Sequence, residues 1–430
     1  MAWFWPEGFY AFLMIGVFAV AAFRMKMPVA VAMLSAALAG ALISGNGVAL
    51  RHLVEGEFGY LDTVMVIAAA MIFMKTLQKT GFLVAFSVWI IRRFRRMPAL
   101  LSAGIVLLIM APGMITGSSI ASVLTTGALM APVLTTLGMQ REKAGAAIAM
   151  GALLGMVAPP VNIPTMMICA GADIPYVGFA LPLLICTVPL ALLFAGIMIY
   201  PALRHFSDEA ALEAQLRRMT AVKLTFRLAL PVVVLVVLTA AEQFCAGTGY
   251  WHFLGMPLIF LISAAAGFFS GTSWSAVNAV GEAIDDSLPI MSVLMGVGMF
   301  IQIMALNGAE GFIVVSALSI PSWALLAGAA IALPVFGAVS AYGSASVLGV
   351  PFLLALLDYN AIFAASALGM LASLGDLMPP GCLSPFFAAQ ALGVKNRFKI
   401  ARCCVWPAIA VALWGAAVIF MSPRLARCLF

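Results

Sequence analysis

The chain has 430 residues, of which 64% are hydrophobic and only 9% are charged, and its formal net charge is +6. Soluble domains are about 45–50% apolar and about 25% charged, so a soluble chain, a disordered chain and a disulfide-rich secreted fold are excluded. The composition indicates an all-α polytopic membrane protein, with room for about ten to twelve crossings at ~20 apolar residues each. In such a protein the positive charge reflects cytoplasmic loops, so we expect no nucleic-acid partner.

The N-terminal residues 1–16 lack the basic region of a cleaved signal peptide. Their aromatic residues are typical of a membrane interface, and we expect them to lead from a periplasmic N-terminus into a first helix. The apolar runs, in chain order, cover residues 7–28, 29–45, 60–91, 98–116, 120–138, 144–171, 176–201, 228–246, 254–270, 288–306, 322–340, 347–357, 361–392 and 405–422. The seven cysteines form no Cys-x-x-Cys pair, so we predict neither a disulfide nor a cysteine metal site.

Basic residues cluster in a few of the gaps between these runs, and the positive-inside rule places those gaps in the cytoplasm. They are Arg24, Lys26, Arg92, Arg93, Arg95, Arg96, Arg141, Lys143, Arg204, Arg217, Arg218, Lys223, Arg227, Lys395, Arg397, Lys399 and Arg402. The run 60–91 is too long for one ordinary span. We expect it to break at Thr80-Gly81. Lys75 and Lys79 lie either in the core or at the inner edge, where they could snorkel to the inner surface. The charged stretch 202–227 predicts a solvated cytoplasmic linker helix.

The segment between Arg96 and Arg141 must leave and return on the same side, because basic residues flank both of its ends. It consists of two apolar halves hinged at Gly117-Ser118-Ser119. The simplest structure is a re-entrant hairpin whose tip lies within the membrane, since irregular backbone is tolerated there against protein or a water-filled cavity. Two complete short helices would also return the chain to the cytoplasm, and the length of the halves does not distinguish these alternatives.

A similar pattern recurs in the second half of the chain. Residues 322–357 form two apolar halves around residues 340–346, and no basic residue follows until Lys395, so this hairpin would enter from the outside. Residues 137–171 align with residues 357–391 at an offset of 220, which brings one Pro-Pro pair onto the other. Asp62 and Asp285 are expected to open the spans that precede the two hairpins.

With five crossings and one hairpin in each half, the second half is inverted relative to the first. The halves are residues 1–201 and 228–430, joined by the linker helix over 202–227. Inverted repeats with paired broken helices are typical of secondary transporters, which bind their substrate near the middle of the membrane. The sequence therefore predicts about ten transmembrane helices plus two re-entrant hairpins.

Each Pro-Pro pair must break its helix, because two amide donors are lost and the rings clash with the preceding turn. The freed helix ends carry partial charges that suit ions. Oxygen-bearing side chains lie near both breaks and both tips, namely Asn162, Thr165, Asp376, Ser384, Ser118, Ser119, Ser344 and Ser346, with the thiol of Cys382. They resemble a hard-cation ligand set, so we expect Na⁺ and no transition metal. Alternatively, these small residues merely allow close helix packing.

Asp376 is the most informative single residue, because a carboxylate within an apolar run is costly and by default functional. It could ligate a cation, carry a proton in place of Na⁺, or pair structurally with a polar neighbour. No Arg or Lys falls securely in the expected core. An anionic substrate would then be held by half-helix N-termini, hydroxyl groups and bound cations.

Ile115–Tyr176 resembles the large membrane subunit of the tripartite ATP-independent periplasmic (TRAP) transporters. A Gly-Ser tip is followed by Pro132, Gly138, an Ala-rich helix, the pair Pro159-Pro160 and a run of small residues. The second half, GSASVLGVPFLLALLDYNAIF and GDLMPPGCLSPFF, keeps the hairpin and the Pro-Pro pair but departs from the family pattern, for instance at Asp376.

The resemblance implies a permease in the bacterial inner membrane that uses a Na⁺ gradient to import small organic acids by an elevator movement. Its implied partners are a small four-helix membrane subunit and a periplasmic substrate-binding protein, and no cofactor is implied. The scaffold would comprise residues 1–60, 176–201, 228–272 and 405–422, and the transport elements residues 98–171 and 322–392. By position, the resemblance maps the tips at Gly117–Ser119 and Gly343–Ser346 and the Pro-Pro breaks onto the family's ion and substrate sites. Together with the oxygen-bearing side chains named above, the expected ion-binding residues are Gly117, Ser118, Ser119, Pro159, Pro160, Asn162, Gly343, Ser344, Ser346, Asp376, Pro379 and Pro380. The expected substrate-binding residues are Ser119, Asn162, Thr165, Ser346 and Ser384.

Two other functions stay open at this stage. A stand-alone ion-coupled carboxylate symporter or antiporter of the same superfamily would need no binding protein. An intramembrane aspartyl protease is suggested faintly by residues 373–376, Ser-Leu-Gly-Asp, and would require a second aspartate such as Asp62. We expect no enzymatic activity, because the three histidines lie in predicted loops and borders and the protease motif is incomplete.

Overall fold

The computed structural model describes residues 5–204, 206, 208–219, 222–245, 254–356 and 358–429. Over these residues the chain is built from helices and their connections, without strands, which confirms the all-α fold. Seven of the described helices are long and apolar enough to cross a membrane, among them both arms of the first hairpin, Pro98–Thr116 and Ser119–Thr136. The polytopic membrane fold is confirmed, whereas the count of ten crossings and the inverted repeat stay predictions.

The N-terminal helices are α1 (Pro6–Ala19), α2 (Val29–Ile43), α3 (Leu50–Phe58), α4 (Leu61–Lys79), α5 (Phe82–Phe94), α6 (Pro98–Thr116), α7 (Ser119–Ser122), α8 (Ala128–Thr136), α9 (Arg141–Val157), α10 (Ile163–Gly171), α11 (Ala180–Phe194), α12 (Tyr200–Arg204) and α13 (Glu209–Met219). The C-terminal helices are α14 (Phe226–Cys245), α15 (Gly255–Ala265), α16 (Ala276–Leu306), α17 (Ala309–Leu318), α18 (Ser322–Gly337), α19 (Ala341–Ser344), α20 (Val350–Ala355), α21 (Ala361–Ser373), α22 (Leu383–Leu392) and α23 (Arg397–Leu429). Short π or 3-10 segments extend several of them, namely η2 (Val20–Arg24), η3 (Val123–Gly127), η4 (Ala195–Ile199), η6 (Ala266–Phe269), η7 (Ala345–Gly349) and η8 (Leu374–Leu377).

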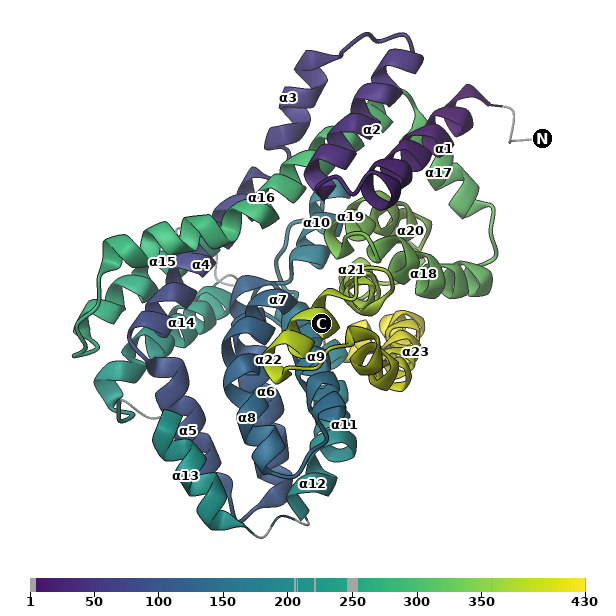
Figure 1. The fold of residues 1–430 in the computed structure, drawn as a ribbon. Coiled ribbons are helices and arrows are strands. Elements are labelled where there is room, and N and C mark those ends of the chain that lie inside the picture. Colours follow the sequence, from purple (N-terminus) through teal and green to yellow (C-terminus); the bar gives the residue numbers. More distant parts are fainter. Residues whose placement is uncertain are drawn as a thin grey trace.

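The helices pack in two groups, each around its own apolar core (Figure 1). One core is formed by α1–α4 with α14–α17, and within it the 31-residue α16 crosses α2, α3 and α4. The other core is formed by α6, α8 and α9 with α11 and α18–α23. Helices α5, α6, α10 and α17 and the segment η7 contribute side chains to both cores. The two hairpins and the two broken helices therefore belong chiefly to one packing unit.

The packing shows the neighbours of two segments that were expected among the scaffold helices. In residues 176–201 and 405–422, α11 and α23 pack against α9 and α21 of the second core. A long apolar helix has the same composition whichever group it joins, so the sequence does not reveal its neighbours. Which group moves relative to the other stays a prediction.

The predicted break at Thr80-Gly81 is confirmed, because Gly81 adopts a left-handed conformation (φ +79°) that ends α4 and begins α5. Lys75 and Lys79, near the end of α4, form ion pairs with acidic residues of α16. The Lys75 ammonium lies 2.6 Å from the Asp286 carboxylate, and Lys79 pairs with Glu282. Asp285 was expected to open its span, but α16 begins at Ala276, so that prediction is wrong.

The predicted linker helix is present as α13, and one of its faces rests on the protein. Leu212 and Leu216 are buried, while Arg92 of α5 donates to the Glu213 carboxylate at 2.7 Å. That hydrogen bond holds the pKa of Glu213 below its usual range. The linker is therefore docked rather than fully solvated, whereas residues 205, 207, 220 and 221 lie outside the described part of the chain.

Candidate functional site

The first hairpin turns at Gly117 and Ser118, between α6 and α7. Gly117 takes a left-handed conformation (φ +64°) that closes α6. Ser118 begins the returning arm as an N-cap, with its hydroxyl accepting from the Ala121 amide at 3.3 Å. Gly117, Ser118 and Ser119 are all buried, so the tip lies inside the protein.

The second hairpin turns three residues earlier than the sequence suggests. Its tip is residues 338–340, and the Ser340 hydroxyl caps α19 by accepting from the Gly343 amide at 3.2 Å. Gly343 and Ser344 lie within α19 and Ser346 within η7, so placing the tip at these three residues is wrong. The two serine hydroxyls bond to nearby backbone instead, Ser344 to Leu333 O at 2.6 Å and Ser346 to Tyr342 O at 3.0 Å.

Both Pro-Pro pairs interrupt a helix, as predicted, and both peptide bonds are cis. In the first break, between α9 and α10, the Asn162 amide donates to Val157 O at 2.8 Å, and its oxygen accepts from the Thr165 amide at 3.0 Å. In the second break, between η8 and α22, the Cys382 thiol donates to Leu377 O at 3.3 Å. One side chain thus reaches back to the end of the preceding half-helix in each break.

The halves of the two broken helices cross one another. The second half of the first, α10, packs on α21, and the second half of the second, α22, packs on α9. Glycines permit the close approaches. A Cβ on Gly369 of α21 would collide with the Thr165 hydroxyl, and a Cβ on Gly337 of α18 would lie 3.0 Å from Gly375 Cα. The crossing brings both breaks and both tips close together, and the Pro379-Pro380 side of the second break stays exposed.

Two side-chain contacts join the hairpins and breaks at this region. Ser119, directly after the first tip, donates a short hydrogen bond to the carboxylate of Asp376 in η8. Tyr342 of the second hairpin donates to Gly117 O of the first tip at 3.2 Å. Asp376 is only 6% exposed, and no ion pair to it occurs within the described residues. A buried carboxylate therefore faces hydroxyl and carbonyl oxygens without a cationic partner.

The structure brings some of the predicted site residues together and separates others. Gly117, Ser118, Ser119 and Asp376 meet at the tip, whereas the side-chain polar atoms of Asn162 are already occupied by its own helix ends. Pro159 is buried, while Pro379 and Pro380 are exposed. Three hydroxyls are buried with no hydrogen-bond partner in the described region, those of Ser122, Thr165 and Ser384.

Three residues of the region were not predicted, namely Ser122, Ser340 and Tyr342. Ser122 lies one helical turn after Ser118, and that spacing was the available signal. Ser340 was visible as a cap, because it precedes an apolar run. The role of Tyr342 depends on a partner 225 residues away and has no local signal.

The atoms of this region that could bind a cation are oxygens. In the described chain no three His, Cys, Asp or Glu residues gather in a way that could hold a metal ion. Hydroxyl, carbonyl and carboxylate oxygens suit hard cations. The partner of the Asp376 carboxylate is the Ser119 hydroxyl, while Asp62, the second aspartate that a protease would need, is exposed at the start of α4.

Two helical hairpins and two broken helices that meet in a buried, oxygen-lined region define a polytopic membrane transporter. The family model for the DctM component of the tripartite ATP-independent periplasmic transporter matches residues 14–425. The chain belongs to this family, which confirms the resemblance drawn from the sequence. The family is one of transporters rather than enzymes.

Among solved structures, the fold is similar to that of the Alcanivorax borkumensis YdaH transporter, whose crystal structure was described as having an unusual topology. The two chains share 14% sequence identity, each is covered over 86% of its length, and the TM-score is 0.60. This likeness concerns the fold alone. No curated protein sequence matches the chain.

Proposed function

We propose that this protein is the Na⁺-coupled membrane permease of a tripartite transporter that imports small carboxylates. The observation that carries this proposal is the hydrogen bond between Ser119 and Asp376, which joins a hairpin tip to the opposite helix break. Secondary transporters bind ions and substrate where discontinuous helices meet near the middle of the membrane. Here that meeting point contains the one strongly buried carboxylate of the described residues.

The Na⁺ site would form around the first tip. Asp376 supplies a negative charge and Ser119 a hydroxyl oxygen. The unpartnered Ser122 hydroxyl, one turn along the same arm, is a further oxygen donor. A hard cation prefers such oxygens, and its binding would compensate a carboxylate that otherwise has no counter-charge in a buried place.

A carboxylate substrate would bind between the two second half-helices. The hydroxyls of Thr165 in α10 and Ser384 in α22 are buried and unpartnered in the described structure. Both lie in the first turn of their helix, where backbone amides and the helix dipole attract negative charge. The expected role of Ser346 is not supported by its bond to Tyr342 O.

The elevator movement would carry the hairpin-and-break core past the group built from α1–α4 and α14–α17. The presence of two apolar cores supports this division, because a group packed around its own core can move as a unit. The hairpins would be re-entrant, since their buried tips meet through Tyr342 and Gly117. The inverted repeat, with a periplasmic N-terminus, belongs to the same proposal.

A proton is a second candidate for the coupling ion, and one observation favours it. The Asp376 carboxylate accepts a short hydrogen bond from the neutral Ser119 hydroxyl. Among the described residues, no basic side chain forms an ion pair with it. A carboxylate in that setting can bind a proton as readily as it binds a cation. Dependence of uptake on Na⁺ or on pH separates the two ions.

The test is uptake into liposomes that contain the protein together with its small membrane subunit, with the periplasmic binding protein added outside. We expect accumulation of a carboxylate that requires an inward Na⁺ gradient and the binding protein. Uptake that needs the Na⁺ gradient but not the binding protein would favour a stand-alone carrier. Uptake driven equally by a pH gradient without Na⁺ would favour proton coupling.

A further inference from the structure

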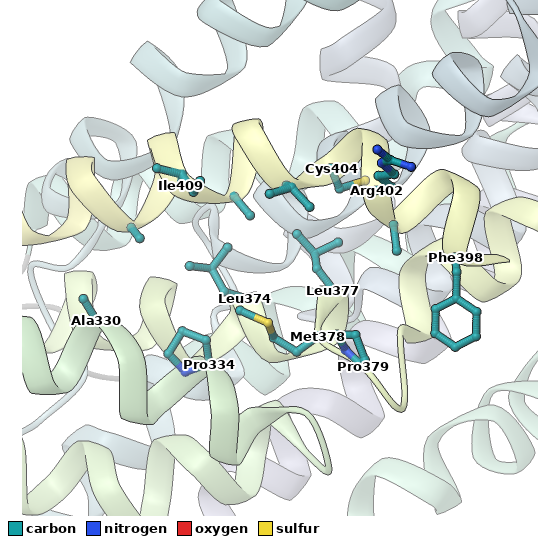
Figure 2. A pocket seen from close by; sticks show the side chains of 14 residues that line it. Ala330, Pro334, Leu374, Leu377, Met378, Pro379, Phe398, Arg402, Cys404 and Ile409 are labelled. Carbon is teal, nitrogen blue, oxygen red and sulfur yellow. The ribbon is translucent and has the colours of Figure 1, made fainter.

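An apolar groove of about 470 Å³ borders the second break at Met378 and Pro379 (Figure 2). Its size falls within the range of about 300–1,000 Å³ that is typical of ligand pockets. Figure 2 shows Ala330 and Pro334 of α18 on one wall and α23 on the other, with Leu374 and Leu377 between them. The segment η8, which carries Asp376, thus contributes to the lining of the groove between α18 and α23.

The lining and the outer rim of this groove are suited to hydrocarbon. Leu374, Leu377, Ala408 and Ile409 present apolar surface to it. Val405 and Ile409, on the α23 wall, are 49% and 42% exposed, so the groove opens on the apolar outside of the protein. The wall from Phe398 to Ala412 corresponds to about 20 Å of helix, and one leaflet contributes about 15 Å of hydrocarbon. A chain that fills the groove would run along one leaflet.

One end of the groove is positively charged. Arg402 lines it there, toward the start of α23 (Figure 2). Arg402 is exposed and has no hydrogen-bond or ion-pair partner in the part of the chain that the structure describes. Lys395, Arg397 and Lys399 lie within seven residues of it, and no acidic residue follows Asp376 in the sequence. This end therefore attracts an anionic group.

Arg397 links the charged end to the second break. Its guanidinium donates to Pro380 O at 3.2 Å and lies over the rings of Phe386 and Phe398, at 5.4 and 5.2 Å. It is thereby held by the protein, which leaves Arg402 as the guanidinium that is free to bind a ligand at the groove. Pro379, on the same break, lines the groove directly.

We infer that this groove binds an anionic phospholipid, with one acyl chain between α18 and α23 and the phosphate on Arg402. Basic pockets between transmembrane helices on the cytoplasmic side bind anionic headgroups. The predicted orientation places the start of α23 at that side. The bound chain would pack on Leu377 and Pro379, next to Asp376 and the break. The inference does not depend on which ion or substrate is transported.

The experiment measures lipid binding to the purified full-length chain in detergent by native mass spectrometry. Phosphatidylglycerol and phosphatidylcholine of equal chain length are titrated separately. We expect phosphatidylglycerol to bind more tightly. Arg402→Gln should weaken its binding about fivefold, since one basic contact contributes about 1 kcal/mol, and should bring the two lipids close to equal affinity. Ala408→Phe should fill the groove and weaken the binding of both lipids.

Two matched controls lie on the same helix but away from the groove. Arg424→Gln removes an exposed charge near the end of α23, and Leu413→Phe enlarges a side chain that is 68% exposed. Both should bind lipid as the unaltered protein does. Equal binding of the two lipids by the unaltered protein, or unchanged binding by both Arg402→Gln and Ala408→Phe, would overturn the inference. Loss of a dimer in Ala408→Phe with lipid binding unchanged would mean instead that a second copy covers the groove.

Discussion

Met156 and Asp376 occupy corresponding positions in the two broken helices, since residues 137–171 and 357–391 align at an offset of 220. Both are buried, with 1% and 6% exposure. A thioether needs no partner there, whereas a carboxylate needs a hydrogen bond or a counter-ion. The first unit, α6–α10, thus supplies the hydroxyls of its tip, and the second unit, α18–α22, supplies the charge. The proposed ion site is therefore asymmetric between the two units.

The two helix breaks also differ, in their hydrogen bonds and in their exposure. Asn162 and Cys382 both reach the carbonyl at the end of the preceding half-helix, at Val157 and Leu377. Of these two side chains, only that of Asn162 also caps the next helix. Pro159 in the first break is buried, whereas both prolines of the second break are exposed. The second break is exposed at Pro379 and borders the groove. The first break is therefore expected to be the more rigid of the two.

The largest effect is expected from Asp376→Asn, which keeps the size of the side chain and removes the charge. A hydrogen bond to a charged group contributes about 1.5–3 kcal/mol, so we expect Na⁺-driven uptake to fall about 10- to 100-fold. Uptake into liposomes measures this. Asp358→Asn, an exposed aspartate near the start of α21, is the matched control and should leave uptake unchanged. If Asp376→Asn takes up the substrate as fast as the unaltered protein, the charge of the second unit is not part of the ion site.

Close packing of the hairpin against its broken helix should be equally necessary in both units. A Cβ on Gly113 would lie 2.8 Å from Gly155 C, and a Cβ on Gly337 would lie 2.9 Å from Ala372 O. We expect Gly113→Ala and Gly337→Ala each to destabilise the protein by about 1–3 kcal/mol through overpacking. Thermal unfolding in detergent checks this.

The control for these glycines is Gly328→Ala, on the same helix as Gly337. Nothing lies within 4 Å of a Cβ built at Gly328. The exchange should stabilise α18 slightly, by about 0.5–1 kcal/mol, because alanine favours a helix interior. A similar loss of stability at all three positions would show that the close approaches are not what matters.

The break side chains should differ in their contribution to stability. Asn162→Ala removes two hydrogen bonds and leaves Val157 O unpaired, so we expect a loss of about 1–3 kcal/mol. Cys382→Ala removes only a weak thiol donor and should cost less than about 1 kcal/mol. Unfolding temperatures compare the two variants. The reverse order would contradict the view that the first break is the more rigid.

The smallest effect concerns a pair of serines in the two returning arms. Ser344 donates to Leu333 O at 2.6 Å, while Ser122, which follows Ser118 as Ser344 follows Ser340, has no partner among the described residues. Ser344→Ala should cost about 0.5–1.5 kcal/mol. Ser122→Ala should leave stability unchanged and raise the Na⁺ concentration needed for half-maximal uptake. Unchanged Na⁺ dependence would exclude Ser122 from the ion site.

Much of the fold follows from local patterns in the sequence. The first tip was predicted correctly, because Gly117 permits the left-handed turn and a serine cap follows it. The Pro-Pro breaks and the interruption at Gly81 are equally local, since these residues decide the backbone conformation by themselves. The second tip was misplaced, because Gly343 suggested a turn, whereas Ser340 actually caps the helix.

The rest depends on contacts between distant segments. Neither the bond between Ser119 and Asp376 nor that between Tyr342 and Gly117 has a signal in the sequence nearby. The packing of α11 and α23 against α9 and α21 likewise has no local signal. The start of α16 at Ala276 places Asp285 within the helix, because the apolar run from residue 288 marks only the most hydrophobic part of a longer helix.

The most direct test of the central claim, that the two units together build one ion site at Ser119 and Asp376, is a calorimetric titration of Na⁺ into the purified protein. The account predicts saturable Na⁺ binding by the unaltered protein, weaker binding by Ser119→Ala, and none detectable in Asp376→Asn. K⁺ serves as the control ion at the same ionic strength. Na⁺ binding of unchanged affinity in Asp376→Asn would contradict the account.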